Sequence, residues 1–228
     1  MTGLGRRFTA ELIGTFTLVY FGCAVVVSNS YPGAAFGLLG IALAHAIALG
    51  VAVTATMNIS GGHLNPALTA GLLVARRIDL KVAVVHWGAQ IVAAILSALA
   101  LKATFPHGLA RIVAYGAPSL NINVSMTQGI FLEALGTFFL MSAVYGTVVA
   151  PTSPKVGGFG VGLTLLFAIM AIGPLTGASL NPARALGPAL ASGQWTAHAT
   201  YWIGPIVGAI LAALVWEFLL MDRNKTTA

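Results

Sequence analysis

Six long apolar stretches constrain the fold of this chain more than any other feature of its sequence. They cover residues 8–28, 36–57, 82–102, 127–150, 158–175 and 200–221. A helix of about 20 residues spans the hydrocarbon of a bilayer, and each stretch is close to that length. The stretches lack the alternation of a barrel strand, and lipid offers unpaired backbone groups no partner. We therefore expect an all-α membrane protein with six transmembrane helices, the fifth being the shortest.

The composition excludes a soluble domain, because 58% of the residues are hydrophobic and only 7% are charged. The net charge is +6, and most basic residues fall on one side when the six stretches are threaded in order. That side carries Arg6, Arg7, Arg76, Arg77, Lys81, Lys155, Arg223 and Lys225. Basic loops mark the cytoplasmic side of a membrane protein, so we expect both termini in the cytoplasm and no nucleic-acid partner.

The tripeptide Asn-Pro-Ala occurs twice, as Asn65-Pro66-Ala67 and as Asn181-Pro182-Ala183, 116 positions apart. Asn caps a helix start with its amide oxygen, and Pro fits the first helical position because it has no N–H to satisfy. Only about ten helix-compatible residues follow each copy, too few to cross a bilayer. Two half-helices are therefore expected. Irregular backbone at membrane depth is tolerated where it lines a water-filled cavity, so the polar segments before both copies should line a shared pore.

The chain also repeats itself. The segment Glu11–Phe16 recurs as Glu133–Phe138, and Trp87–Leu96 recurs as Trp202–Leu211. Each half then holds three spans and one half-helix, and an odd number of spans forces the second half to insert upside down. We expect one channel domain over residues 1–228, with a first repeat at 6–103, a linker at 104–125 and an inverted second repeat at 126–222.

Together these features resemble the aquaporin (major intrinsic protein) family. The resemblance rests on the two Asn-Pro-Ala copies, on Arg184 directly after the second copy, and on the repeated Glu-x-x-Gly-Thr-Phe, and it extends from Glu11 to Glu217. It implies a passive channel for water and small neutral solutes, assembled as a homotetramer in a lipid bilayer, with no cofactor and no metal ion. An enzyme is not expected, because the histidines show no nucleophile and base at a recognisable spacing.

Transferred residue by residue, the family pattern implies several roles in the pore. The amides of Asn65 and Asn181 would donate to passing water where the positive ends of the two half-helices meet, which opposes proton conduction in aquaporin-type pores. Backbone carbonyls would line one wall at Gly61, Gly62, His63, Leu64, Gly177, Ala178, Ser179 and Leu180. A narrow selectivity filter would consist of His45, Ile169, Ala178 and Arg184.

Alternatives stay open for the charged residues. Glu11 and Glu133 are carboxylates inside apolar stretches, a costly arrangement that often marks function. The family resemblance implies that they brace the polar segments by accepting hydrogen bonds from backbone N–H groups, and proton transport is the alternative. Arg184 could likewise pair with a core carboxylate instead of facing the pore.

The filter residues also bear on the solute and the membrane. The combination of His45, Ile169, Ala178 and Arg184 is similar to that of plant tonoplast intrinsic proteins, some of which also pass ammonia. Ala185 stands where glycerol channels of the family place Asp, which disfavours the alternative of a glycerol or small-polyol facilitator. A secondary transporter is a further alternative, since inverted repeats also build those proteins. Short tails and loops favour a prokaryotic inner (plasma) membrane.

Overall fold

The computed structural model describes residues 3–151, 153–154 and 156–221. Within these ranges, six helices are long and apolar enough to cross a membrane. They are α1 (Gly3–Ser28), α2 (Gly37–Ser60), α4 (Leu80–Thr104), α6 with its π-helical end η2 (Met126–Val144 and Tyr145–Val149), α7 (Phe159–Thr176), and α9 with η3 (Thr200–Val215 and Trp216–Leu220). The expected all-α membrane fold is confirmed. Lys155, Arg223 and Lys225, expected on the cytoplasmic side, lie outside the described residues.

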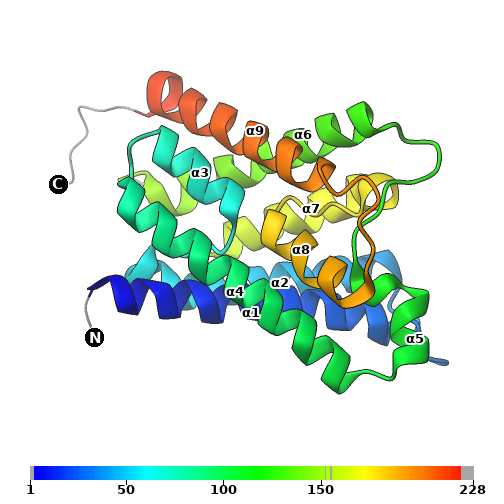
Figure 1. Ribbon diagram of the computed structural model, residues 1–228. Coiled ribbons are helices and arrows are strands. Elements are labelled where there is room, and N and C mark those ends of the chain that lie inside the picture. The colour runs from blue at the N-terminus through cyan, green and yellow to red at the C-terminus, as the bar shows by residue number, and fades with distance from the viewer. Residues whose placement is uncertain (1–2, 152, 155, 222–228) are drawn as a thin grey trace.

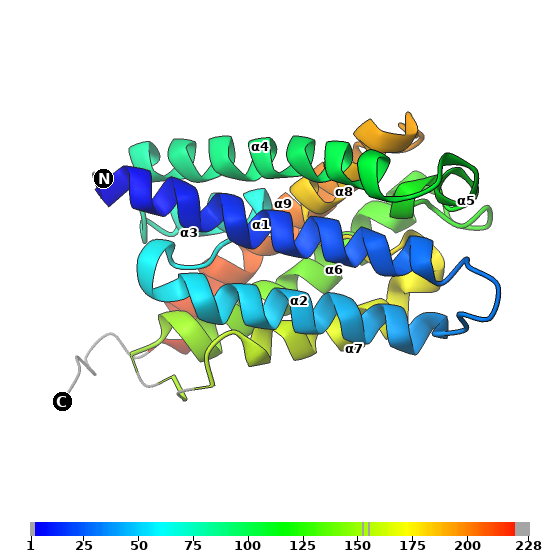
Figure 2. The same ribbon diagram turned by 90° about the horizontal axis from the view of Figure 1, so that it is seen from below.

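The long helices run roughly along one common direction, with shorter helices between them (Figures 1 and 2). α1 packs against α2 and α4, while α6 packs against α7 and α9. A contact between α2 and α7 joins these two groups. The start of α1 and the end of α9 lie at the same end of the bundle in both views, as an even number of spans requires.

Two of the shorter helices begin directly after the Asn-Pro-Ala asparagines. These are α3 (Pro66–Val74) and α8 (Pro182–Ser192), of 9 and 11 residues. At a rise of about 1.5 Å per residue each covers roughly half a bilayer. Asn65 and Asn181 cap them, each accepting a hydrogen bond at 2.9 Å from the backbone N–H two residues on. The two expected half-helices are confirmed.

The far end of α3 is tied to the end of α9. The Arg77 guanidinium pairs with the Glu217 carboxylate, which also accepts a hydrogen bond from the Tyr145 hydroxyl at 2.9 Å. The hydrogen bonds to Glu217 raise the pKa of Arg77, so its charge is kept at any physiological pH. The half-helix is thereby held at both ends, by its cap and by this ion pair.

Glycines set how closely the elements approach. A Cβ at Gly208 would lie 2.0 Å from the Ala134 carbonyl oxygen, so α6 and α9 are in backbone contact there. Gly14 and Gly136, the glycines of the repeated Glu-x-x-Gly-Thr-Phe, leave room for the leucines of the two polar segments. A Cβ would lie 2.4 Å from Leu64 Cδ2 at Gly14 and 2.6 Å from Leu180 Cδ2 at Gly136.

The segment expected as a linker contains two more short helices, α5 (His107–Ile112) and η1 (Ala114–Gly116). η1 contacts both α1 and α8. Its three residues all have positive φ, of 45°, 54° and 80°. Tyr115 is buried, and its hydroxyl lies 2.6 Å from His107 Nδ1. This linker therefore folds inward and places the Gly116 carbonyl close to the second half-helix.

Candidate functional site

Glu11 holds the polar segment before α3. It lies in the first third of α1, is completely buried, and accepts four hydrogen bonds. The Oε1 atom accepts from Ser60 Oγ at 2.6 Å and from the His63 N–H at 3.0 Å. The Oε2 atom accepts from the Leu64 N–H at 2.7 Å and from Gln90 Nε2 at 2.8 Å. These contacts hold the polar segment before α3 in place.

Glu133 holds the segment before α8 in the same way. Its Oε1 atom accepts from Thr176 Oγ1 at 2.7 Å and from the Ser179 N–H at 3.0 Å, and its Oε2 atom accepts from the Leu180 N–H at 2.7 Å. These bonds help to fix backbone that L-residues rarely adopt, since φ is 51° at Leu180. The matching residue of the first segment, Leu64, has φ of 52°.

The two polar segments are also bonded to each other. Asn65 Nδ2 donates to the Leu180 carbonyl at 2.8 Å, and Asn181 Nδ2 donates to the Leu64 carbonyl at 2.9 Å. A primary amide has two N–H donors, so each Asn keeps one N–H for another acceptor. The N-termini of α3 and α8 therefore meet around a crossed pair of hydrogen bonds.

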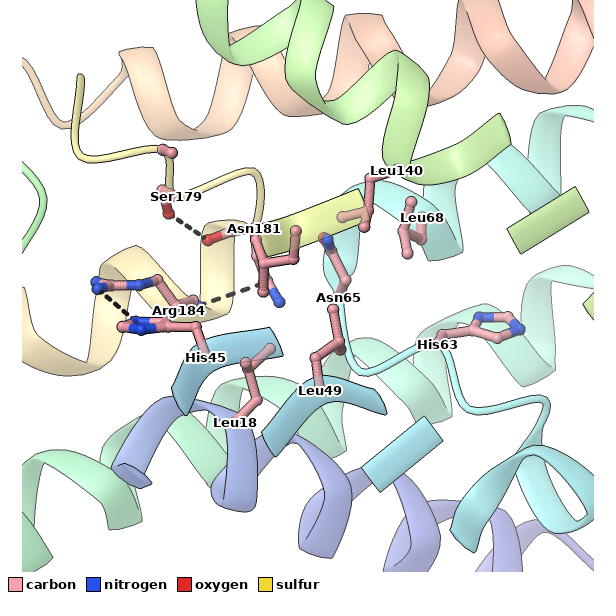
Figure 3. A pocket seen from close by; sticks show the side chains of 12 residues that line it. Leu18, His45, Leu49, His63, Asn65, Leu68, Leu140, Ser179, Asn181 and Arg184 are labelled. Atoms are coloured by element: carbon pink, nitrogen blue, oxygen red, sulfur yellow. Dashed lines mark hydrogen bonds between the residues drawn. The ribbon is translucent and has the colours of Figure 1, made fainter. Parts of the chain in front are cut away.

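A narrow cavity runs past this junction (Figure 3). Its volume of about 10 Å³ is close to the minimum that holds one water molecule. The cavity is lined by Leu18, His45, Leu49, His63, Asn65, Leu68, Leu140, Leu165, Ala178, Ser179, Asn181 and Arg184. Apolar side chains thus form much of the wall. The polar groups come mainly from the starts of the two half-helices and from the polar segments before them, residues 60–64 and 176–180, which we call the approach segments.

Arg184 is held at one end of the cavity by two bonds. Its Nη1 atom donates to the Gly116 carbonyl at 2.9 Å, and its Nη2 atom lies 3.1 Å from His45 Nε2. His45 Nδ1 lies 2.9 Å from the Ile41 carbonyl. Because arginine can only donate, His45 must accept at Nε2 and carry its proton on Nδ1. Arg184 is thus bound to a carbonyl and an imidazole, and neither partner is a core carboxylate.

The four residues expected in the filter lie around the end of the cavity. His45 and Arg184 line both the narrow cavity and a wider one of about 330 Å³, Ala178 lines the narrow cavity, and Ile169 lines the wider one. The quartet is therefore brought together where the passage widens. Its role in selecting solutes stays a prediction.

The expected carbonyl residues divide into three groups. His63, Ala178 and Ser179 line the narrow cavity, and Gly177 lines the wider one. The carbonyls of Leu64 and Leu180 accept the crossed amides. Gly61 and Gly62 belong to the same approach segment but are outside both sets of lining residues. A continuous carbonyl wall stays a prediction.

Three residues of the site were missed by the sequence analysis. Gly116 contributes only a carbonyl, and nothing in its side chain could have marked it. Gly22 leaves room for the His45 ring, because a Cβ there would lie 2.7 Å from His45 Nε2. Gln90 supplies a donor to Glu11, and a buried amide in an apolar stretch was the one available signal.

The comparisons with known proteins agree with this geometry. The family model described as major intrinsic protein matches residues 2–216. The chain belongs to the major intrinsic protein family. Members of this family are channels and not enzymes, so the expectation of a non-enzymatic membrane channel is confirmed. The fold is also that of an aquaglyceroporin from Plasmodium falciparum, with a TM-score of 0.86 at 24% identity over 95% of this chain and 97% of that one.

Relatives within the family are plant aquaporins. The chain is 39% identical to aquaporin TIP4-4 of Zea mays, over 97% of this chain and 89% of the relative. It is 40% identical to the probable aquaporin TIP4-1 of Oryza sativa subsp. japonica, over 97% and 90%. It is 38% identical to the probable aquaporin TIP3-2 of Arabidopsis thaliana, over 95% and 84%. The expectation of a prokaryotic inner membrane is therefore wrong, because these relatives, 38–40% identical over nearly the whole chain, are plant TIP aquaporins.

Proposed function

We propose that this major intrinsic protein is a passive channel for water that also passes ammonia. The observation that carries the proposal is the narrow cavity between the starts of α3 and α8, whose volume of about 10 Å³ leaves room for one water molecule at a time. None of the described residues that line it is a carboxylate or a lysine, so it offers no site for a coupling ion. The relatives named aquaporin support water as the principal solute.

Proton exclusion would arise at the junction of the half-helices. Each helix N-terminus carries about half a positive charge, and both point at the middle of the cavity. The remaining N–H of Asn65 and of Asn181 would donate to the oxygen of a water molecule, which must then turn its hydrogens outward. Opposed water orientations on the two sides interrupt a proton wire. An ion would also lose hydration worth on the order of 20 kcal/mol in the idealised limit, which this wall does not replace.

Solute selection would take place at His45, Ile169, Ala178 and Arg184. Arg184 and His45 form a bonded polar edge, while Ile169 and Ala178 present apolar surface. Ammonia accepts a hydrogen bond well and is about as small as water, so one polar edge satisfies it. Glycerol carries several hydroxyl groups and needs more donors and a wider opening.

We further propose a homotetramer in a plant vacuolar membrane, with the Arg-rich side in the cytoplasm. Each subunit would hold its own pore, formed by a repeat at 6–103, a linker at 104–125 and an inverted repeat at 126–222. Exposed apolar side chains on α1 and α2, among them Phe21, Ile47 and Val51, provide a face for lipid or a neighbouring subunit.

Stopped-flow measurements on proteoliposomes test the proposed function. Osmotic shrinkage of the vesicles reports the efflux of water. A trapped pH-sensitive dye reports the alkalinisation that entering ammonia causes, and reswelling of the vesicles reports the entry of glycerol. We expect water and ammonia fluxes well above those of empty vesicles, no glycerol flux, and no dissipation of an imposed proton gradient. Water flux equal to that of empty vesicles would contradict the channel, and glycerol flux comparable to water flux would favour the polyol alternative.

A further inference from the structure

A pair of histidines stands at the end of the narrow cavity away from Arg184. His63, on the approach segment of α3, lines the cavity, and Figure 3 places it beyond Asn65 as seen from Arg184. Behind it lies His86 on α4, which is completely buried. The two Nδ1 atoms are 3.2 Å apart, and the rings stand at 81° with their centroids 4.5 Å apart. Two imidazoles at this distance share a hydrogen bond.

Either His63 or His86 can be the donor in that hydrogen bond. If His63 donates, His86 must carry its own proton on Nε2, which is buried and has no partner among the described residues. If His86 donates, its Nε2 atom is a bare acceptor and no N–H is orphaned. Orphaned buried donors are the rarer case in proteins. The Glu11 carboxylate lies 4.0 Å from His86 Nδ1 and also favours a proton there.

The other ring nitrogen of His63, Nε2, has no hydrogen-bond partner among the described residues. Thr69 Oγ1 and His86 Nδ1 lie on the Nδ1 side of the ring, at 3.1 Å and 3.2 Å. With Nδ1 bare, the single Thr69 hydroxyl proton serves either this nitrogen or the Asn65 carbonyl at 3.0 Å. The His63 Nε2 atom lies beside Gly61, where a Cβ would come to 3.0 Å. The lack of a side chain at Gly61 keeps this nitrogen uncovered.

We propose that His86 is a positioning residue that fixes His63 with its proton on Nε2, so that His63 is a hydrogen-bond donor to solutes in the pore. The pore then presents donors at three levels, which are Arg184, the two Asn amides and His63. The inference rests on the proposed channel function, because a donor in the wall matters only if solutes pass it.

The second half of the chain supports a role beyond bracing. By the matching motifs, His63 corresponds to Ser179 and His86 to Tyr201. There, Ser179 Oγ donates to the Asn181 carbonyl and the Tyr201 hydroxyl donates to the Thr176 carbonyl at 2.9 Å. The second approach segment is thus held without imidazoles, so holding the loop does not require the histidine pair. The charged groups around the pair are Glu11 and Arg7, both on α1.

The test is nitrogen NMR on the full chain in lipid bilayers, labelled with ¹⁵N-histidine. The His63 signals are identified by their loss in His63→Ser, which installs the residue of the second half. At neutral pH we expect a protonated Nε2 and a bare Nδ1 on His63. In His86→Phe, which has no donor, we expect a mixture of both tautomers. His86→Tyr, the counterpart residue, supplies a hydroxyl donor and should restore the Nε2–H form, while His198→Gln should leave the His63 signals unchanged.

A flux measurement on the same variants separates this inference from the proposed function. Ammonia is the better acceptor, so His86→Phe should lower the ammonia-to-water ratio by about threefold, the size expected for one neutral hydrogen bond. His86→Tyr should recover the ratio. A wild-type His63 with its proton on Nδ1, or an unchanged tautomer in His86→Phe, would overturn the inference even if vesicles conduct. Vesicles that fail to conduct would overturn the channel and leave the tautomer result standing.

Discussion

At the scale of single residues, the predicted filter consists partly of side chains that have little freedom. His45 is fixed by the Ile41 carbonyl on one ring nitrogen and by Arg184 on the other. Arg184 is in turn fixed by the Gly116 carbonyl. Because both ring nitrogens of His45 are occupied, a change at Arg184 alters how the imidazole is held.

The first prediction changes the width and charge of the predicted filter. Arg184→Val removes the fixed charge and the longest side chain of the quartet, so the opening widens, and we expect a higher ammonia-to-water ratio and entry of urea-sized solutes while water flux persists. Ile169→His places a larger, polar ring in the opening and narrows it, so the ratio should fall. Both fluxes are measured in vesicles of the same lipid. Equal ratios in the wild type and both variants would show that this quartet is not the filter.

The second prediction uses Gly22, which is not among the residues that line either cavity. In Gly22→Ala the new methyl group would lie 2.7 Å from His45 Nε2, so the imidazole must move and its bond to Arg184 is lost. We expect a several-fold change in the ammonia-to-water ratio with little loss of folded protein. The matched control is Gly88→Ala in α4, where the nearest atom is 3.9 Å away. If both variants behave like the wild type, His45 does not set the filter.

At the scale of elements, the half-helices are held in place by groups far from them in sequence. Glu11 and Glu133 reach the approach segments from α1 and α6, and Arg77 ties α3 to α9. Helices this short are marginal on their own, so their position comes from these tertiary bonds. Chain connectivity alone would leave the ends of α3 and α8 free to separate.

The third prediction concerns Glu133. In Glu133→Gln one oxygen becomes an NH₂ group, which faces the N–H donors of Ser179 or Leu180 and leaves at least one of them unpaired. An unpaired buried group costs about 1–3 kcal/mol, so we expect a lower midpoint of thermal unfolding in detergent and reduced water flux. Asp79→Asn, which keeps a helix cap at an exposed site, is the control. A variant with unaltered stability and water flux but altered proton leak would favour the proton-transport alternative.

The fourth prediction concerns Arg77, whose side chain is 35% exposed. Arg77→Ala breaks the ion pair that anchors the end of α3. Solvent screens part of the interaction, so a loss of about 1 kcal/mol in unfolding free energy is expected. Lys81→Ala, at an exposed site near the start of α4, serves as the comparison in the same thermal unfolding assay. Equal midpoints for the two variants would show that the pair does not stabilise the half-helix.

At the scale of the whole molecule, the sequence predicted what depends on length and local chemistry. Six spans follow from the apolar stretches, and both half-helices follow from an Asn cap, a Pro and too few residues to cross. The crossed bonds of Asn65 and Asn181 could not be predicted, because they join loops 116 positions apart. Gly116 acts through its backbone carbonyl, which no sequence pattern marks, and nothing in the sequence places His86 beside His63. The lengths of the tails and loops do not identify the membrane, which is why the expectation of a prokaryotic inner membrane was wrong.

The crossed amides also have a consequence for biosynthesis. When the first half of the chain emerges from the ribosome, the Leu64 carbonyl and the Asn65 amide lack their partners, because Leu180 and Asn181 have not been made. At about 5–20 residues per second the wait is on the order of 6–23 s. The first re-entrant segment must spend that interval either unsatisfied in the bilayer or outside it. The junction between the two half-helices can therefore form only after the second half has been made.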